Sequence, residues 1–264
     1  MNDFTYHAPT SMDEAVAALR GSGAKLIAGG QSLLPVMKLN LAAPSDLVSL
    51  AGVPGLADIA DGGDSVTVGA MCTHAQVAGS GIVQARIPAL AAMADGIGDA
   101  QVRNAGTIGG SVAHNDPAAD YPAACVALGA TIVTDRREIH SDDYFQGMFM
   151  TALGDDEVIT AVRFPVPSRA AYAKFANPAS KYAVAGVMVA DGPAGVRVAV
   201  TGASGDGVFR VGAMEEALQA SFSGDSVAGI AVSSDGMLSD TAAGAEYRAH
   251  LVTVMAKRAV EACG

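Results

Sequence analysis

The chain has 264 residues, of which half are apolar and 5% aromatic, so it is long enough to bury a sizeable core. Sixteen basic against 27 acidic residues give a net charge of −11, which argues against an extended electrostatic grip on nucleic acid or an anionic membrane. Cys72, Cys125 and Cys263 are too few and too far apart to encode a disulfide framework, a zinc site or an iron–sulfur site. No run of about eighteen apolar residues and no signal-peptide pattern occurs. We therefore expect a soluble, cytoplasmic chain without a membrane span, a metal site of its own or affinity for nucleic acid.

Helices and strands are expected to follow one another irregularly. Residues 10–20 open with hydroxyl and acidic residues and end before Gly21, which predicts a capped amphipathic helix. The other predicted elements are strands at 25–28, 46–50, 65–70, 130–133, 157–165, 183–189 and 195–201, and helices at 74–83, 88–94, 120–128, 212–221 and 245–262. Because strict strand–helix–strand alternation is absent, the pattern favours an α+β fold. The stretch Pro165-Val166-Pro167-Ser168 predicts a domain boundary.

Two glycine-rich segments carry most of the functional information. The first is Gly29-Gly30-Gln31-Ser32 after an apolar strand, and the second runs from Gly106 to Ser111 with the sequence GTIGGS. Adjacent glycines beside hydroxyl residues let a backbone approach a polyanion closely and donate N–H groups to it. One such turn is a weak signal. Two of them suggest a single extended phosphate-bearing ligand held from both sides.

The segment 101–122, QVRNAGTIGGSVAHNDPAADYP, resembles the FAD-binding medium subunit of the molybdenum hydroxylases, the group of bacterial carbon monoxide dehydrogenase and xanthine dehydrogenase. Further stretches agree with the same family, namely AGGQSLLP at 28–35, DYF at 143–145 with TAL at 151–153, and NPASKYA at 177–183. The resemblance implies an α+β, two-subdomain FAD-binding fold (PCMH/vanillyl-alcohol-oxidase-like), followed by a C-terminal antiparallel three-stranded sheet with helices. The implied domains are 1–55 and 56–167, which bind FAD, and the C-terminal domain 168–264.

The same resemblance implies a set of FAD contacts. The first glycine turn would wrap the pyrophosphate, and the second would form the opposing wall, with Gly106 permitting a chain reversal. Asp120 would accept a hydrogen bond from a ribityl or ribose hydroxyl, and apolar residues with Tyr182 would flank the flavin. The complete set is Lys25, Ile27, Ala28, Gly29, Gly30, Gln31, Ser32, Leu33, Ile97, Gly106, Thr107, Gly109, Gly110, Ser111, His114, Asp120, Ile159 and Tyr182.

Several of these residues also have a purely structural interpretation. Asp120 stands where it could cap the following helix. Ile97 and Ile159 are equally consistent with core packing. We interpret His114 as a loop residue packed near the cofactor rather than a base. Lys174 could approach the flavin or lie on the surface, and we favour the surface. The Met-containing stretch 144–150 is either a docking face or part of the core.

As a function, the resemblance implies an FAD-carrying electron-transfer subunit with no catalytic residue of its own for the organic substrate. Its partners would be a small subunit with 2Fe–2S clusters and a large subunit with molybdopterin, assembled as a dimer of heterotrimers. Two alternatives stay open, a self-sufficient FAD-dependent oxidase and a non-catalytic nucleotide-binding module. In this family the large subunit sets the organic substrate, so carbon monoxide, N-heterocycles, purines and aldehydes are all compatible with the resemblance.

Overall fold

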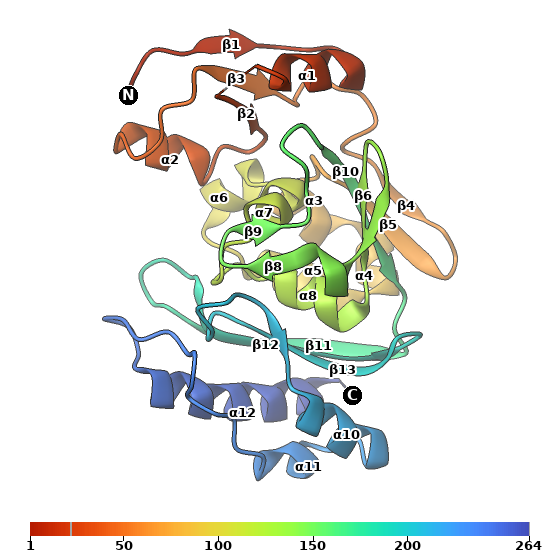
Figure 1. Ribbon diagram of the computed structural model, residues 1–264. Coiled ribbons are helices and arrows are strands. Elements are labelled where there is room, and N and C mark those ends of the chain that lie inside the picture. Colours follow the sequence, from red (N-terminus) through yellow and green to blue (C-terminus); the bar gives the residue numbers. More distant parts are fainter. Residues whose placement is uncertain (22, 264) are drawn as a thin grey trace.

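The computed structural model describes residues 1–21 and 23–263 and arranges them as three lobes along one axis (Figure 1). We call them the N-terminal, central and C-terminal lobes, each defined by one main sheet. Ser22 and the last residue of the predicted domain 168–264 lie outside the described residues. The α+β class predicted from the sequence is confirmed, and the domain boundaries at 55 and 167 stay predictions.

The N-terminal lobe contains a parallel sheet in the order β1-β3-β2. Its elements are β1 (Thr5–His7), α1 (Met12–Leu19), β2 (Ala24–Ile27), α2 (Leu33–Lys38) and β3 (Asp46–Ser49). Helix α1 begins after Ser11, whose hydroxyl accepts a hydrogen bond from the N–H of Glu14. The small apolar core of this lobe includes Val158, which comes from the central lobe and so joins the two.

The central lobe contains a five-stranded antiparallel sheet in the order β4-β5-β10-β6-β7. Its strands are β4 (Ile59–Asp61), β5 (Ser65–Gly69), β6 (Thr131–Thr134), β7 (Glu138–His140) and β10 (Ile159–Pro165), with a hairpin of β8 (Phe145–Gly147) and β9 (Met150–Thr151). Its helices are α3 (His74–Gly79), α4 (Gly81–Arg86), α5 (Pro88–Asp95), α6 (Ala100–Ala105), α7 (Ile108–His114), α8 (Tyr121–Leu128) and α9 (Ser141–Tyr144). Every residue of α8 is buried, which places this helix at the centre of the molecule.

Two details of the central lobe differ from the sequence prediction. The single helix expected at 74–83 is two helices, because Ser80 has an extended conformation and its hydroxyl caps α4 by accepting from the N–H of Val83. The second glycine segment, expected as a turn, forms the first turn of α7. In the pairing of β10 with β6, the register shifts between Ile159 and Ala161. Val158 and Ile159, which precede this shift, are both buried, the former in the core of the N-terminal lobe.

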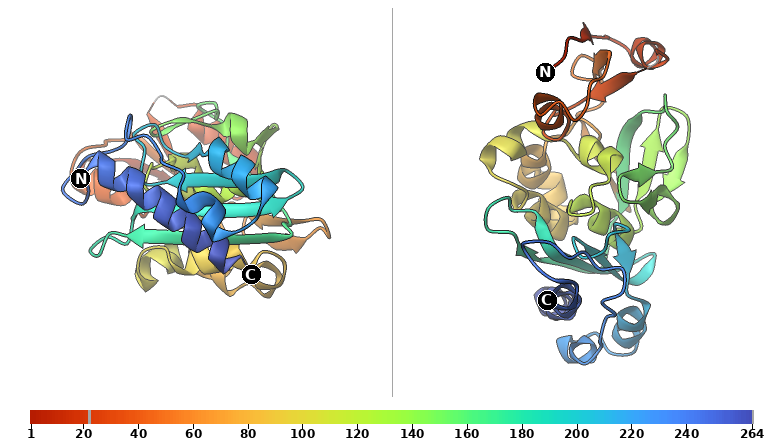
Figure 2. Two further views of the ribbon diagram at one scale, coloured as in Figure 1. Left: turned by 90° about the horizontal axis from the view of Figure 1, so that it is seen from below. Right: turned by 60° about the vertical axis from the view of Figure 1, so that its left-hand side comes forward.

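The C-terminal lobe contains an antiparallel sheet in the order β11-β12-β13-β14. Its elements are β11 (Arg169–Ala176), β12 (Ala183–Gly192), β13 (Gly195–Thr201), β14 (Phe209–Arg210), α10 (Gly212–Ala220), α11 (Gly224–Ala228) and α12 (Ala245–Ala262). The expected three-stranded sheet thus has a short fourth strand. One face packs on α12 and the other on α5 and α8 of the central lobe, so the sheet lies between two helical layers (Figure 2).

Candidate functional site

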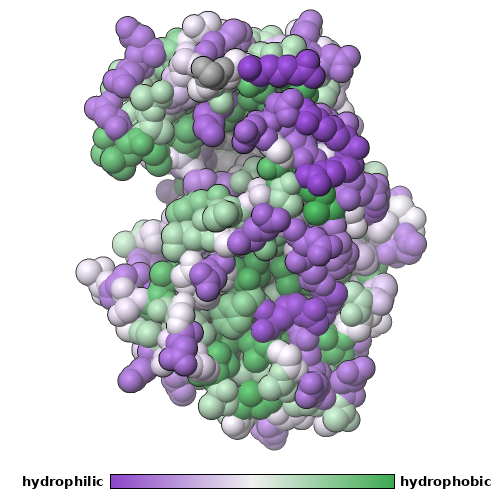
Figure 3. Space-filling model, viewed as in Figure 1, coloured by the Kyte–Doolittle hydropathy of each residue, from purple (hydrophilic) through white to green (hydrophobic). Residues whose placement is uncertain are grey.

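A cleft of about 870 Å³ separates the N-terminal lobe from the central lobe and reaches the segment before β12. Figure 3 shows the surface hollowed below the N-terminal lobe. This volume lies within the range of about 300–1,000 Å³ that is usual for ligand pockets. All eighteen residues predicted at the FAD site line the cleft. Their contacts with a cofactor stay predictions.

The first wall of the cleft is the turn between β2 and α2. Gly30 has a φ of +69°, a left-handed conformation that favours glycine. Among the described residues, none accepts a hydrogen bond from the backbone N–H groups of Gly30, Gln31 or Ser32. Ser32, at the start of α2, makes no side-chain cap either. These donors are therefore available to an anionic ligand.

Two of the glycines are needed for contacts within the protein. An ideal Cβ atom on Gly29 would lie 2.0 Å from the carbonyl oxygen of Ala105, and one on Gly109 would lie 2.5 Å from the Cβ of Ala70. Both distances are shorter than real Cβ contacts allow. A side chain at Gly29 is thus excluded by the end of α6 before any ligand is considered.

The second wall differs from the first in how its N–H groups are used. The N–H of Gly109 donates to the carbonyl of Ala70 at 2.9 Å, and the N–H of Gly110 donates to Oγ1 of Thr107 at 3.2 Å. The expectation that this wall offers free N–H groups like the first therefore fails at Gly109 and Gly110. The polar side chains that line the cleft here are those of Thr107 and Ser111.

Gly106 does not reverse the chain through an unusual conformation, because its φ of −63° is available to any residue. It is needed instead because an ideal Cβ atom there would lie 2.6 Å from Nε2 of His74. His74 also lines the cleft, and its ring centroid is 5.4 Å from that of Tyr121. Burial, aided by the charge of Arg103, lowers the pKa of His74 to about 4, so this imidazole is neutral at pH 7. No sequence motif pointed to His74.

Asp120 lines the cleft beside the C-terminal lobe and is 4% exposed. Its carboxylate accepts a hydrogen bond from the hydroxyl of Tyr172 at 2.5 Å and pairs with Nζ of Lys174 at 3.0 Å. The side chain makes no cap with α8, so the capping interpretation is wrong. The side chain of Lys174 is only 10% exposed, so its assignment to the surface is wrong as well.

The comparisons with known proteins agree with this geometry. A family model described as the FAD binding domain in molybdopterin dehydrogenase matches residues 2–167. The chain is 38% identical over 276 residues to the carbon monoxide dehydrogenase medium chain of Hydrogenophaga pseudoflava, covering 98% of this chain and 96% of that one. It is also 38% identical over 274 residues to the nicotine 6-hydroxylase medium subunit of Paenarthrobacter nicotinovorans, with the same coverage of 98% and 96%. The chain belongs to this family of FAD-binding subunits.

Solved structures of this family have the same fold. Carbon monoxide dehydrogenase from Hydrogenophaga pseudoflava, which lacks the Mo-pyranopterin moiety of its molybdenum cofactor, matches with a TM-score of 0.89 and 37% identity over 99% of this chain and 97% of that one. Quinoline 2-oxidoreductase from Pseudomonas putida 86 matches with a TM-score of 0.89 and 27% identity, again over 99% and 97%. The predicted FAD-binding fold with its C-terminal sheet is confirmed. The chain is the FAD-binding medium subunit of a molybdenum hydroxylase.

The cleft has the features that a medium subunit needs to hold FAD. A turn with unpaired N–H groups suits a pyrophosphate, and the carboxylate of Asp120 can accept a hydrogen bond from a hydroxyl group. Ile97 is half-buried, Ile159 is buried and Tyr182 is 46% exposed, and all three line the cleft. An apolar ring system fits against such side chains.

The rim of the cleft contains a strained aromatic residue that sequence reasoning did not single out. Phe149 is 53% exposed, has a φ of +56° and lies at the tip of the β8–β9 hairpin. Its ring centroid is 5.0 Å from that of His114, which is the last residue of α7 rather than a loop residue. The amide of Asn115 holds the tip by donating to the carbonyls of Gly147 and Met150, both at 2.8 Å. The stretch 144–150 is therefore buried at Tyr144 and exposed at its apolar tip.

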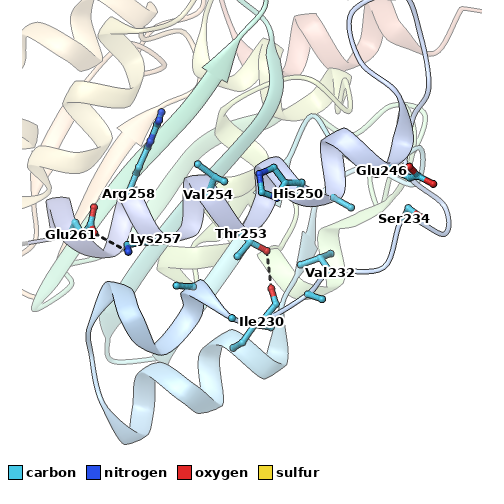
Figure 4. A pocket seen from close by; sticks show the side chains of 14 residues that line it. Ile230, Val232, Ser234, Glu246, His250, Thr253, Val254, Lys257, Arg258 and Glu261 are labelled. Atoms are coloured by element: carbon cyan, nitrogen blue, oxygen red, sulfur yellow. Dashed lines mark hydrogen bonds and ion pairs between the residues drawn. The ribbon is translucent and has the colours of Figure 1, made fainter.

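A second hollow, of about 660 Å³, lies on the C-terminal lobe between α12 and residues 228–234 (Figure 4). The hydroxyl of Thr253 donates to the carbonyl of Ile230 at 2.8 Å across it. None of the predicted site residues lines it. In residues 1–21 and 23–263, no cluster of three or more His, Cys, Asp or Glu could hold a metal ion. No described helix has the length and apolar character to span a membrane.

Proposed function

We propose that this chain transfers electrons through FAD in a heterotrimeric molybdenum hydroxylase. It would receive them from 2Fe–2S clusters in a small subunit and pass them to an external acceptor, while a large molybdopterin subunit oxidises the substrate. The observation that carries this proposal is the cleft, which combines unpaired N–H groups on one wall with apolar side chains around Ile159. When bound, FAD supplies the ability to accept and release electrons.

The chain's own residues would bind and shield the cofactor. The N–H groups of Gly30, Gln31 and Ser32 would donate to the pyrophosphate, and the hydroxyls of Thr107 and Ser111 would face it from the second wall. The side chains of Ile97, Ile159 and Tyr182 would flank the flavin ring and exclude water from it. No side chain in the cleft is required to act as an acid or base on an organic substrate.

The names of the relatives support the proposed partners, because a medium chain or medium subunit is one component of a larger enzyme. We propose a small iron–sulfur subunit and a large molybdenum subunit, assembled as a dimer of heterotrimers. The candidate docking surface is the apolar tip formed by Met148, Phe149 and Met150, which are 41%, 53% and 60% exposed. We also propose that the protein is cytoplasmic, as expected from the sequence.

Co-expression of this chain with the proposed small and large subunits tests the electron-transfer role. Substrate should bleach the flavin in the purified complex and leave the flavin of the isolated chain oxidised. If the isolated, iron-free chain reduced its flavin with an organic substrate at a comparable rate, it would be a self-sufficient oxidase instead.

Acid precipitation and absorption spectra test for a covalent flavin oxidase and for a nucleotide-binding module. Because no attachment residue stands in the first turn, acid should release all flavin into the supernatant. Flavin that stayed in the pellet would indicate covalent attachment, as in many oxidases. A purified chain that bound a nucleotide but remained colourless would indicate a non-catalytic nucleotide-binding module.

A further inference from the structure

The C-terminal lobe reaches into the cofactor cleft at Asp120. Tyr172 and Lys174, both on β11, contact its carboxylate, and Nζ of Lys174 also donates to the carbonyl of Gly96 at 2.9 Å. We propose that Tyr172 is a positioning residue that holds Asp120 for FAD, so that the C-terminal lobe completes the cofactor site. This inference rests on the proposed function.

A glycine on the neighbouring strand leaves room for this contact. Gly186 on β12 pairs with Lys174 in the register of the sheet. An ideal Cβ atom on Gly186 would lie 2.1 Å from the hydroxyl oxygen of Tyr172. Any other residue at 186 would therefore displace the hydroxyl from its position beside Asp120. Glycine is otherwise unfavourable in the interior of a strand, so its presence here fits a specific requirement for close approach.

The two β11 residues also stabilise the charged form of Asp120. Burial raises the pKa of Asp120, whereas the charge of Lys174 and the hydrogen bond from Tyr172 oppose this rise. In the part of the chain that the structure describes, the other titratable groups that interact with Asp120 are Tyr121, the first residue of α8, and Tyr182 before β12. Burial raises the pKa of both tyrosines above the ordinary value, so both stay neutral around pH 7.

The test is titration of the FAD-free full-length chain with FAD, followed by flavin fluorescence. Tyr172→Phe should weaken binding about tenfold, which corresponds to about 1.4 kcal/mol. Because ionised Asp120 is the acceptor, affinity falls as the pH drops through the pKa of Asp120. Removing the Tyr172 hydrogen bond raises that pKa, so in the variant the fall must begin at a higher pH. Asp120→Asn should bind weakly at every pH and show no such fall.

Two control variants distinguish the positioning of Asp120 from a general loss of contact between the central and C-terminal lobes. Arg197 of β13 makes two hydrogen bonds to Asp142 of the central lobe, at 2.8 and 2.9 Å, and Asp142 does not line the cleft. Asp142→Asn weakens this second contact between the same lobes and should leave FAD affinity unchanged. Tyr121→Phe should also leave it unchanged, because in residues 1–21 and 23–263 nothing is hydrogen-bonded to that buried hydroxyl.

The inference is wrong if Tyr172→Phe binds FAD with wild-type affinity and an unshifted pH profile. It is also wrong if Asp142→Asn weakens binding as much as Tyr172→Phe does. If Tyr172→Phe fails to fold, Asp120→Asn provides the test. An FAD affinity of Asp120→Asn that equals that of the wild type and does not change with pH would overturn the inference. Failure of the wild-type chain to bind FAD would instead contradict the proposed function.

Discussion

Gly29 and Ala105 meet where the N-terminal lobe touches the central lobe, so closely that a Cβ atom on Gly29 would lie 2.0 Å from the Ala105 carbonyl oxygen. Gly110 is different, because its nearest obstacle would be Oγ1 of Thr107 at 3.0 Å and the next Cβ of Ala28 at 3.8 Å, across the cleft. A side chain at Gly29 would therefore collide with the protein's own backbone, whereas a side chain at Gly110 would enter the space proposed for FAD.

Gly110→Ala should weaken FAD binding with little effect on the FAD-free chain. Alanine is favoured over glycine in a helix by up to about 1 kcal/mol, which offsets the tight contact with Thr107. FAD at 100 times its dissociation constant stabilises the wild type by about 2.7 kcal/mol, and the variant should lose most of that gain. Thermal melting with and without FAD measures both quantities. Gly29→Ala, in contrast, should lower the melting temperature in both conditions.

Because His74 is buried, we expect the free energy of unfolding to decrease in mild acid. Because burial lowers its folded pKa to about 4, the unfolded chain takes up a proton first as the pH falls below about 6.5. Stability should therefore decrease between pH 6.5 and 4, by up to roughly 3 kcal/mol. His74→Phe should flatten this part of the profile in urea unfolding. Parallel profiles for wild type and His74→Phe would contradict the burial argument.

Glu157 predicts a second effect at lower pH. Its side chain is 3% exposed and hydrogen-bonds to Arg137, which lowers the pKa of Glu157 to about 2. The stabilisation is present above the unfolded pKa of about 4.3 and is lost as the pH falls toward 2. Glu157→Gln should cost about 1.5–3 kcal/mol at pH 7, and less at pH 3. If the difference in unfolding free energy between variant and wild type stayed constant from pH 7 to 3, the charge of the Glu157 carboxylate would not contribute to stability.

Phe149 combines strain with exposure. A bulky residue in the left-handed region costs about 1–2 kcal/mol. Phe149→Gly removes this cost but also the ring contact with His114, and glycine raises the entropy of the unfolded chain, so the stability of the isolated chain should change by less than about 1 kcal/mol. If the tip docks a partner, the same change should reduce co-purification with the small and large subunits. Tyr247→Ala on α12, where the side chain is 48% exposed, is the matched control for loss of a surface aromatic. Unchanged co-purification of Phe149→Gly would exclude the tip as the docking surface.

The sequence was most informative where the functional residues are neighbours along the chain. Segments 28–33 and 106–114 contain most of the predicted cleft residues, and their glycines and hydroxyls are readable directly. The contact of Tyr172 with Asp120 joins residues 52 apart and depends on how a sheet packs against α8, for which no local pattern exists. Burial of Lys174 was missed for the same reason. The helix break at Ser80 did have a signal, since Gly79 and Gly81 are both poor helix formers.

The residues at the start of β10 belong both to the contact between two lobes and to the wall of the cleft. Val158 packs into the core of the N-terminal lobe, and both Val158 and the next residue, Ile159, line the cleft. A one-residue shift of the backbone at this point would turn the side chains of β10 to the opposite face of the sheet, as any one-residue slip in a strand does. The wall of the cleft and the contact that joins the N-terminal lobe to the central lobe therefore share one stretch of backbone. Changes in the width of the cleft at this point should therefore occur together with changes in the core around Leu19 and Leu50, which also line the cleft.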